Sequence, residues 1–547
     1  MLGTELALGG VRVQILERRA TAQRDSRALT LHPRSIELLD QRGLADRFLA
    51  GGRRVPGWHF AGLDTRLDFS TLDTRHGYTL FLAQARTEQL LAERAKELDV
   101  PVRRGYEVVG LRQNAAGNGT GSGGPDEAGV EVAVRGPGGT VETVRARYVV
   151  GCDGGRSMVR RAAGIGFPGT DETLSGALGD FADVAPEALD RARAHGVLAV
   201  PLEPEPLTGP APKGDRAEDP AGRCTEDPAG GWTEGPAGPR TEDPAGGRTG
   251  GGTRIVLLDP QRMRTPSAEP LTLDEFRASL RRICGTDCGV AQPRWLSRFG
   301  NATRLAASYR AGRVLLAGDA AHIHFPAAGQ GLNTGLQDAM NLGWKLAAEI
   351  NGWAPPGLLD SYHAERHPVG QAVTENTEVQ TLLAELTLVS PYQRPAAALR
   401  GLLTELLGIE EVNRRLAGLV SALDTAYPPT GADADPLAGR RMPDITLTAT
   451  GSAALRVYEL LPHGRFVLLD LAGDEEMRQS VETAWGKRVT ALGVTEYDSR
   501  TDLDGVREIL VRPDGHIAWA TRSTDVQTRR TERVRALTSW AGRPAGE

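Results

Sequence analysis

The sequence predicts an α/β fold, with α+β parts, in which parallel strands alternate with helices, and three observations favour it. The chain opens with a short helical stretch, a Gly-Gly turn and a β-branched strand that ends at Glu17. A second strand, RYVV, runs into the turn Asp153-Gly154. A third, RVLLAG, runs into Gly318-Asp319, before a helix that starts on glycines. Because open α/β sheets bind ligands at the carboxyl ends of their strands, these acidic turns also predict a binding site.

The opening stretch, MLGTELALGGVRVQILERRA, is typical of the second half of a dinucleotide-binding unit. In such a Rossmann-like unit a strand enters a G-x-G-x-x-G loop, a helix follows, and an acidic residue about 20 positions later binds the ribose. Counting back from Glu17 places the last glycine of the loop just before Met1. We therefore expect the first strand and the G-x-G-x-x-G loop to be missing at the N-terminus and to lie within roughly 15 to 30 residues upstream, unless the chain is a degenerate remnant. The alternative is a surface helix followed by an edge strand.

The segment 312–346, GRVLLAGDAAHIHFPAAGQGLNTGLQDAMNLGWKL, carries the strongest signal. After Pro326, Gly329 and Gly331 lead into a helix whose backbone N–H groups would point at a ligand in the preceding loop. Apolar residues recur at helical spacing at positions 332, 336, 339, 340, 346 and 347. The alternative is a glycine-rich helix start that binds nothing.

Two further glycines, Gly335 and Gly343, lie two turns apart on the same helix. They would allow a close approach to a flat ligand or to a neighbouring backbone. The Asp153-Gly154 pair, taken alone, could be only a turn.

Length and composition indicate a globular protein of roughly three or four domains, with 547 residues of which 40% are hydrophobic. A net charge of −6 argues against nucleic acid or an anionic membrane as the main partner. No apolar run approaches the ~18 residues that cross a bilayer, and Glu5 interrupts the place of a signal-peptide core, so we expect a cytoplasmic protein. The cysteines lack the spacing of a metal site and are expected to be reduced thiols: Cys152, Cys224, Cys284 and Cys288.

Two low-complexity segments are expected to lie outside the packed cores. From Ala217 a Pro- and Gly-rich octad recurs as AEDPAGRC, TEDPAGGW, TEGPAGPR and TEDPAGGR, so we interpret 203–253 as a disordered insertion. The stretch NAAGNGTGSGGPDEAG contains a G-x-G-x-x-G match at Gly119, Gly121 and Gly124. Because it lies between two alternating strands and precedes a proline, not a helix, we expect a hairpin loop and no phosphate site.

The segment YRAGRVLLAGDAAHIHFPAAGQGLNTGLQDAMNLGWKLA resembles the FAD-dependent aromatic hydroxylases with the para-hydroxybenzoate hydroxylase fold, which are class A flavoprotein monooxygenases. The resemblance is closest to their aromatic polyketide branch and runs from Met1 to the end, apart from the octad insertion. It implies that Glu17 binds the adenosine ribose and that Arg27 and Gln84 contact the FAD. It also implies that Asp153 lies in an Asp-Gly motif near the FAD and the nicotinamide, and that Asp319 binds the ribityl chain. The implied cofactor-binding residues are Glu17, Arg27, Gln84, Asp153, Gly154, Gly318, Asp319, Pro326, Gly329, Gly331, Leu332 and Asn333. Of these, the backbone around Gly329, Gly331, Leu332 and Asn333 is implied to abut the isoalloxazine.

The resemblance also implies an activity. NADPH or NADH would reduce the FAD, O2 would add at flavin C4a, and the resulting hydroperoxide would hydroxylate an electron-rich ring of a polycyclic aromatic polyketide. No second dinucleotide fingerprint is present, which agrees with a nicotinamide that only visits the flavin. The substrate cavity is expected between the flavin and a middle sheet formed by GALGDFADV, HGVLAVPLE and TRIVLLDP. The sequence identifies no general base, and His322 and His324 are expected to be structural or solvent-facing.

The domain organisation follows from the same resemblance. We expect the first part of the FAD-binding domain over 1–175 and a substrate-binding domain over 176–300 that contains the insertion 203–253. The FAD-binding domain then returns with a helical region over 301–435, and a thioredoxin-like domain without redox cysteines covers 436–547.

Two alternatives to hydroxylation stay open. One is a Baeyer–Villiger-type oxygenation of a related polyketide, and the other is a noncatalytic truncated homologue that keeps the fold for binding or assembly. A flavin halogenase is disfavoured because the sequence contains no W-x-W-x-I-P motif. The expected partners are the small aromatic substrate and O2, with no nucleic acid, membrane or metal, in a monomer or homodimer.

Overall fold

The computed structural model describes residues 1–22, 25–114, 129–182, 184–195, 197–202, 252–388, 392–429, 431, 434–449 and 453–545. The Gly-rich stretch with the G-x-G-x-x-G match and almost all of the octad insertion lie outside these residues. The last residue assigned to the insertion, Thr253, already belongs to a strand.

The chain begins as predicted, with a helix that feeds a strand. Helix α1 (Leu2–Leu8) is followed by the turn Gly9-Gly10 and by strand β1 (Ile15–Glu17). β1 pairs in parallel with β7 (Val102–Arg104), and β11 (Val149–Gly151) pairs in parallel with β19 (Val314–Leu316). Within the described ranges no pairing joins β1 to β11, so this parallel sheet consists of two pieces. The strand and loop expected upstream of Met1 concern residues outside the chain and stay a prediction.

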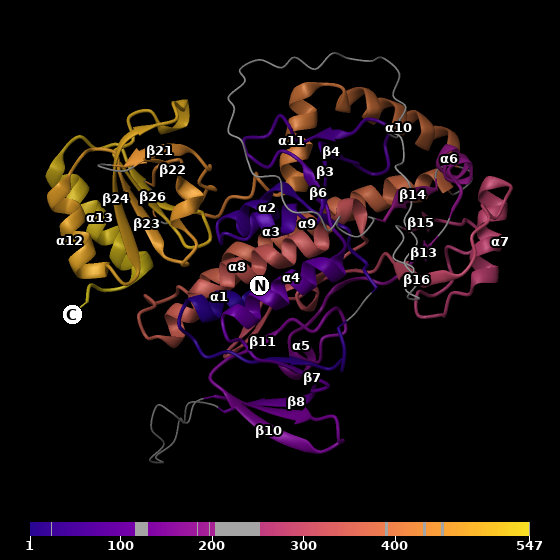
Figure 1. The fold of residues 1–547 in the computed structure, drawn as a ribbon, viewed down its shortest axis with the longest axis horizontal. Helices are drawn as coiled ribbons and strands as arrows, with labels where there is room; N and C mark the ends of the chain where they lie inside the picture. The colour runs from indigo at the N-terminus through magenta and orange to yellow at the C-terminus, as the bar shows by residue number, and fades with distance from the viewer. Residues whose placement is uncertain are drawn as a thin grey trace, which may run out of the picture.

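Short elements surround these strands. Between β1 and β7 lie β2 (Thr30–Leu31), α2 (Pro33–Asp40), α3 (Ala45–Leu49), β3 (Arg53–Val55), β4 (Gly57–Trp58), β5 (Leu67–Asp68), β6 (Thr79–Phe81) and α4 (Gln84–Glu97). An antiparallel sheet of β8 (Glu107–Gln113), β9 (Val130–Arg135) and β10 (Val141–Ala146) projects from the bottom of the molecule in Figure 1. Helix α5 (Met158–Ala162) and strand β12 (Gly169–Thr170) lead on to the middle sheet.

The middle sheet contains the three predicted strands and one that the sequence did not indicate. Its order is β14-β15-β13-β16, with β13 (Ser175–Phe181), β14 (Leu198–Pro201), β15 (Thr253–Leu257) and β16 (Pro293–Gly300). Helices α6 (Pro186–Ala194) and α7 (Leu273–Cys284) pack on it through a shared apolar cluster. β16 was missed because it begins at a proline and contains three arginine or polar positions among its aromatic ones.

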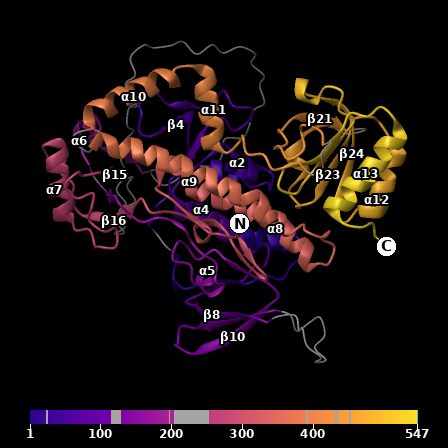
Figure 2. The ribbon, with the colours of Figure 1, turned by 180° about the vertical axis from the view of Figure 1, so that it is seen from behind.

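Two long helices form the centre of the molecule. α8 (Gln330–Ile350) matches the predicted glycine-started helix, and α9 (Ser361–Leu388) packs along it. Figures 1 and 2 show both between the middle sheet at one end and the C-terminal domain at the other, with α10 (Gln393–Leu407) and α11 (Glu410–Ser421) on top. Before α8 lie β17 (Thr303–Leu305), β18 (Arg310–Ala311), η2 (Gly318–Ala320), β20 (His322–Ile323) and η3 (Ala327–Gly329).

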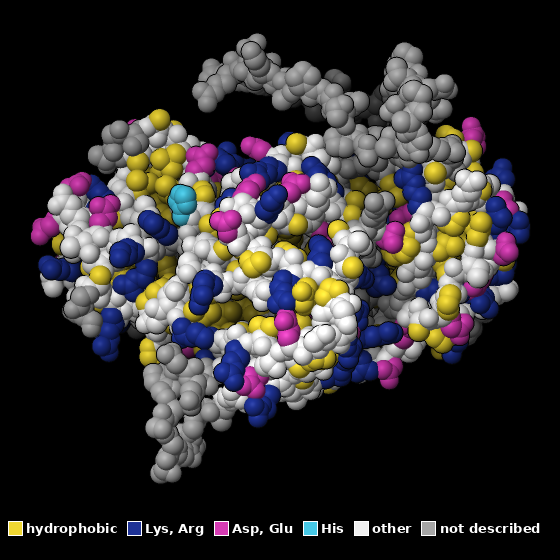
Figure 3. Space-filling model, turned by 60° about the horizontal axis from the view of Figure 1, so that its bottom comes forward, with side chains coloured by type: hydrophobic (Ala, Val, Ile, Leu, Met, Phe, Trp, Pro, Cys, Tyr) yellow, Lys and Arg dark blue, Asp and Glu magenta, His cyan; other side chains and the backbone are white. Residues whose placement is uncertain are grey.

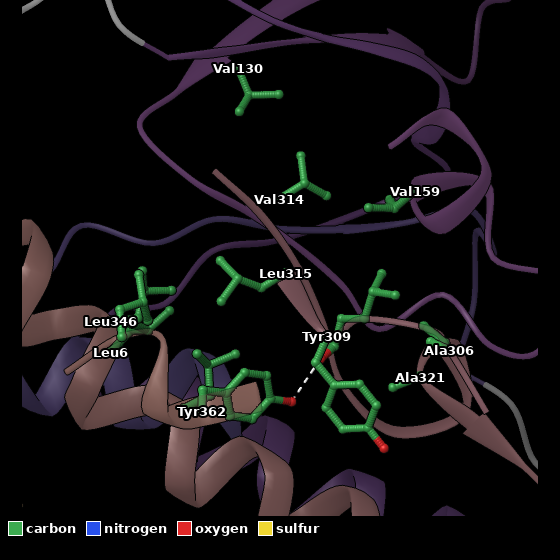
Figure 4. Packing of buried hydrophobic residues seen from close by; sticks show 14 of the residues in the cluster. Leu6, Val130, Val159, Ala306, Tyr309, Val314, Leu315, Ala321, Leu346 and Tyr362 are labelled. Atoms are coloured by element: carbon green, nitrogen blue, oxygen red, sulfur yellow. Dashed lines mark hydrogen bonds between the residues drawn. The ribbon is translucent and has the colours of Figure 1, made fainter. Parts of the chain in front are cut away.

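The largest apolar cluster joins α1, α8 and α9 to the parallel strands. It includes Leu6 of α1, Leu346 of α8 and Leu315 of β19, all buried (Figure 4). Tyr362 of α9 donates its hydroxyl to the carbonyl of Leu316 at 2.7 Å, so the polar end of this fully buried ring is satisfied. This cluster holds the ends of β11 and β19 in place against α8.

The C-terminal domain contains a six-stranded mixed sheet of β21 (Thr446–Ala449), β22 (Ala454–Arg456), β23 (Phe466–Asp470), β24 (Val489–Tyr497), β25 (Glu508–Val511) and β26 (Ile517–Thr521). Its order is β22-β21-β24-β23-β25-β26, and among the described residues only β23 and β24 pair in parallel. Helices α12 (Glu475–Trp485) and α13 (Val526–Ala541) cover one face together with Trp344 of α8. Residues before β21 and after β22, among them Met442 and Tyr458, pack on the other. The domain also contains the short helices η4 (Val457–Leu460) and η5 (Thr501–Leu503).

The surface carries charges of both signs. Figure 3 shows basic and acidic side chains scattered together over one face, in keeping with the small net charge of −6. None of the helices in the described ranges is both long and apolar enough to span a bilayer.

Candidate cofactor site

Two of the predicted acidic turns meet at one edge of the parallel strands. β11 and β19 pair side by side, Gly151 opposite Leu316. The first strand is followed by Asp153 and Gly154, and the second by the 3-10 turn η2, which contains Gly318 and Asp319. Asp319 is exposed at this edge. The third acidic residue, Glu17, ends β1 in the other piece of the sheet.

The N-terminus of helix α8 is directed at the same edge of the parallel strands. Ala328 and Gly329 have φ of 52° and 67°, which turns the chain into the helix, and the N-cap Gly329 offers no side chain to the first amides. A methyl group on Gly329 would lie 2.6 Å from Thr30 Oγ1, so the position requires glycine. The uncapped N–H groups and the positive end of the helix dipole suit a ligand with carbonyl oxygens or negative charge.

Asn333 connects the start of α8 to the segment before α2. Its Oδ1 accepts the backbone N–H of His32 at 2.8 Å, and its Nδ2 donates to the carbonyls of Gly329 at 2.8 Å and Thr30 at 3.2 Å. The side chain therefore fixes the loop, and the backbone from Gly329 to Asn333 is what a ligand can contact. Leu332 is partly buried and packs against an apolar cluster that includes Leu31 and Ile36.

The turn η2 and helix α8 approach each other at two glycines. A Cβ on Gly335 would lie 3.3 Å from the Cα of Gly318, which itself has φ of 61°. Gly335 and Gly343 were predicted to allow a close approach to a flat ligand or a neighbouring backbone. The structure shows that Gly335 faces the backbone of Gly318 and that Gly343 faces Glu5 of helix α1.

The structure places the other predicted residues in separate surroundings. Glu17 accepts the backbone N–H of Arg19 at 2.7 Å, and Arg27 is exposed with its carbonyl accepting from Arg254. Gln84, the first residue of α4, accepts the N–H of Ala28 at 3.1 Å. Pro326 is exposed at the start of the loop before α8. Their contacts to FAD stay predictions.

The carboxylate of Asp153 is engaged by its own segment. It accepts hydrogen bonds from Ser157 Oγ at 2.5 Å and from the backbone N–H groups of Met158 at 2.7 Å and Val159 at 3.1 Å. These bonds cap the start of α5. The neighbouring Gly154, with φ of 83°, makes the turn after β11.

The two histidines near α8, expected to be structural or solvent-facing, have partners within the protein, and their roles stay predictions. His322 is buried and its Nε2 lies 2.8 Å from Asp338 Oδ2. His324 is half-buried, with Nδ1 2.7 Å from the carbonyl of Phe325. Burial lowers the pKa of His324 below its usual value, so the neutral imidazole predominates at neutral pH.

His32 is a residue at this site that the sequence analysis did not identify. It is fully buried, its Nε2 donates to the carbonyl of Ala328 at 2.7 Å, and its Nδ1 has no hydrogen-bond partner among the described residues. Its ring meets Trp58 and Phe69 edge-on. The only local signal was a histidine directly before Pro33 at a helix start.

Acid is expected to destabilise the protein through His32. Burial lowers its pKa from 6.5 to about 4, so below pH 6.5 the unfolded chain binds a proton that the folded chain does not. This contribution to stability is complete above pH 6.5 and falls by about 1.4 kcal/mol per pH unit as the pH drops to 4. Urea unfolding of the wild type and of His32→Gln at several pH values measures it. Identical slopes in the two proteins would contradict the assignment.

A cavity of about 520 Å³ lies beside the first turns of α8. Residues of α8, α9, α11 and the following segment line it, among them Gln330, Gln337, Val369, Leu419 and Tyr427. The Nε2 of the buried Gln330 has no partner within the described part of the chain. In that part, no group of three or more His, Cys, Asp or Glu residues could hold a metal ion.

The residues at this edge fit the flavin end of FAD. The uncapped amides of α8 match the pyrimidine carbonyls of an isoalloxazine, and the exposed carboxylate of Asp319 matches the hydroxyls of a ribityl chain. Among the described residues, His32 Nδ1 and Gln330 Nε2 are buried polar atoms without a hydrogen-bond partner, which is typical of a site that a ligand completes.

Comparison with known proteins agrees with this fit. Residues 1–377 match the "FAD binding domain" family, and residues 435–544 match the "aromatic-ring hydroxylase, C-terminal" family. The chain is 41% identical to a 12-dehydrotetracycline 5-monooxygenase/anhydrotetracycline 6-monooxygenase of Streptomyces rimosus, covering 100% of this chain and 97% of the relative. It is 43% identical to a rifampicin monooxygenase of Streptomyces venezuelae, over 95% of this chain and 93% of the relative.

A solved structure extends the likeness to three dimensions. The anhydrotetracycline hydroxylase from Streptomyces rimosus superposes with a TM-score of 0.79 at 38% identity, covering 100% of this chain and 97% of that one. FAD is thus the cofactor, and the mixed α/β architecture is that of the relatives. The protein belongs to the family of FAD-dependent aromatic-ring hydroxylases and is a flavoprotein monooxygenase.

Proposed function

We propose that the protein uses NADPH or NADH and O2 to hydroxylate a polycyclic aromatic polyketide. The observation that carries the proposal is the meeting of the uncapped start of α8 with the Gly318-Asp319 turn, at the end of the parallel strands. Relatives named for tetracycline and rifampicin oxygenation, at 41% and 43% identity, support the substrate class. The same names support a role in antibiotic chemistry.

Three parts of the proposed site have distinct physical roles. Asp319 would hold the ribityl hydroxyls, Glu17 the adenosine ribose, and the backbone from Gly331 to Asn333 the pyrimidine edge of the flavin. When bound, FAD supplies the electron transfer and the oxygen chemistry. The dipole of α8 would stabilise negative charge on the reduced ring, and the protein excludes water.

The domains would divide this work. The FAD-binding parts over 1–175 and 301–435 hold the cofactor, and the middle sheet within 176–300 forms the far wall of the substrate cavity. We assign a thioredoxin-like fold to 436–547, which contains no cysteine. This domain therefore has a structural role, and thiol redox chemistry is excluded for it.

Turnover with aromatic probes tests the proposal. The FAD-loaded protein is incubated with NADPH or NADH, O2, and either anhydrotetracycline or rifampicin, and the products are analysed by mass spectrometry and NMR. We expect substrate-stimulated nicotinamide oxidation and a hydroxyl group on an aromatic carbon. A lactone with oxygen inserted into a C–C bond would instead establish a Baeyer–Villiger oxygenation. Failure to bind FAD would favour a noncatalytic homologue.

Asp319→Ala is expected to weaken FAD binding about 10- to 100-fold, because hydrogen bonds to a charged group contribute roughly 1.5–3 kcal/mol. Titration of the apoprotein with FAD, followed by flavin fluorescence, measures the effect. Asp171→Ala is the matched control, since that carboxylate is 90% exposed and pairs only with Arg304 in the described residues. Equal dissociation constants for the two variants would remove Asp319 from the site.

A further inference from the structure

We propose that Asp338 is a positioning residue of the FAD site, whose carboxylate holds the Gly318-Asp319 turn where it meets the cofactor. The inference rests on the proposed function, because it requires this turn to bind FAD. Asp338 lies in the middle of α8 and is fully buried.

The contacts of Asp338 clamp the turn from both sides. Its Oδ2 accepts the backbone N–H of Gly318 at 3.0 Å and also lies 2.8 Å from Nε2 of His322. Gly318 directly precedes Asp319, and His322 follows it by three residues. The carboxylate therefore fixes the backbone on each side of the side chain that is proposed to bind the ribityl group.

The turn and helix α8 also meet at a pair of glycines. Gly335 and Gly318 face each other without side chains, so the packing there consists of backbone contact alone. If Asp338 loses an acceptor oxygen, the part-buried N–H of Gly318 loses its hydrogen bond unless the turn moves. Such a movement displaces Asp319 directly.

Arg366 of α9 keeps the carboxylate charged and oriented. Its Nε donates to Asp338 Oδ1 at 2.8 Å, and its two other nitrogens donate to the carbonyl of Thr334 and the hydroxyl of Tyr427, both at 3.3 Å. Although burial acts to raise it, Arg366 and His322 lower the pKa of Asp338 to about 2. At neutral pH the carboxylate is a pure acceptor for all three donors.

Glu365, the neighbour of Arg366, provides a matched control. It is also buried on the α8–α9 contact and also pairs with an arginine, Arg512, at 2.8 Å, as well as with Lys345 at 2.7 Å. Arg512 belongs to the C-terminal domain and Lys345 to the second half of α8, so this network joins the two long helices to that domain and not to the Gly318-Asp319 turn. The two carboxylates thus differ in what they hold and resemble each other in burial and charge.

The experiment compares FAD binding and melting temperature in Asp338→Asn, Glu365→Gln and the reference Asp319→Ala. In Asp338→Asn one carboxylate oxygen becomes an NH2 group. With the remaining oxygen on Arg366, this NH2 group takes the place of Oδ2, and the N–H of Gly318 loses its acceptor. We expect an FAD dissociation constant raised at least about tenfold, with loss of the resolved absorbance of bound flavin. Glu365→Gln, at a similar loss of melting temperature, is expected to change the dissociation constant less than about threefold.

A second pair covers the case in which Asp338→Asn does not fold. Arg366→Lys and Arg512→Lys both keep the positive charge beside the buried carboxylate and lose the guanidinium fork. Only Arg366→Lys is expected to weaken FAD binding. Equal FAD affinities within the pairs, with a weakened Asp319→Ala, would overturn the positioning role. Normal FAD affinity in Asp319→Ala would instead overturn the proposed site itself.

Discussion

Replacing Arg512 with methionine is expected to lower the free energy of unfolding by about 3–5 kcal/mol, because buried carboxylates lose their cationic partner. Arg512 lies in the turn between β25 and β26 and is 1% exposed. Its guanidinium donates to both oxygens of Glu365 at 2.8 Å and to Asp514 at 2.5 and 3.1 Å. These bonds connect the C-terminal domain to α9, so the variant should also loosen the contact between the domains.

Arg500→Met is the control for this prediction. Arg500 also reaches from the C-terminal domain to the first part of the chain, where it pairs with Asp73 at 2.8 Å. That carboxylate is 57% exposed, so the cost is expected to stay near or below about 1 kcal/mol. Urea unfolding followed by circular dichroism compares the two variants. Equal losses of unfolding free energy in the two variants would show that burial of the Arg512 network adds nothing to stability.

Replacing Gly343 with valine is expected to cost about 3 kcal/mol or more, because α8 and α1 touch at this glycine. A Cβ at Gly343 would lie 2.3 Å from the Cβ of Glu5. Glu5 is itself buried and pairs with Arg42 at 2.7 Å. The added side chain must therefore push α1 away from α8 and disturb a buried ion pair.

Gly401→Val makes the same substitution in helix α10, where a Cβ would meet nothing within 4 Å. Its effect is expected to lie within about 0.5 kcal/mol, since valine is no worse a helix former than glycine. Thermal unfolding of both variants measures the difference. A stable Gly343→Val protein would mean that α1 does not pack on α8 as described.

Elements that depend on local pattern were predictable. The spacing of apolar residues along α8, the glycines at its start and the strands that run into Asp153 and Asp319 all appear within short windows of sequence. A helix or strand with one buried face imposes its period on the residues that form it. The α/β class and the site edge could therefore be inferred before any contact was known.

Residues whose role comes from distant partners could not be predicted. His32 meets Asn333 across 301 positions, and Arg512 meets Glu365 across 147. In the sequence, Asp338 is one of several polar residues of α8, beside Gln337 and Asn341, and nothing local distinguishes it from a solvent-facing position. Only the packing of α9 shows that it is buried beside Arg366.

By itself, the sequence determined the fold class, the glycine-started helix and the acidic turns, because each depends on neighbours along the chain. The resemblance carried by 312–346 determined the family, since a long motif constrains chemistry as well as structure. The tertiary structure alone decided which buried charges hold those turns in place. Hydrogen bonds and ion pairs act over a few ångströms, so they form between whichever side chains the fold brings together, however far apart they lie in sequence.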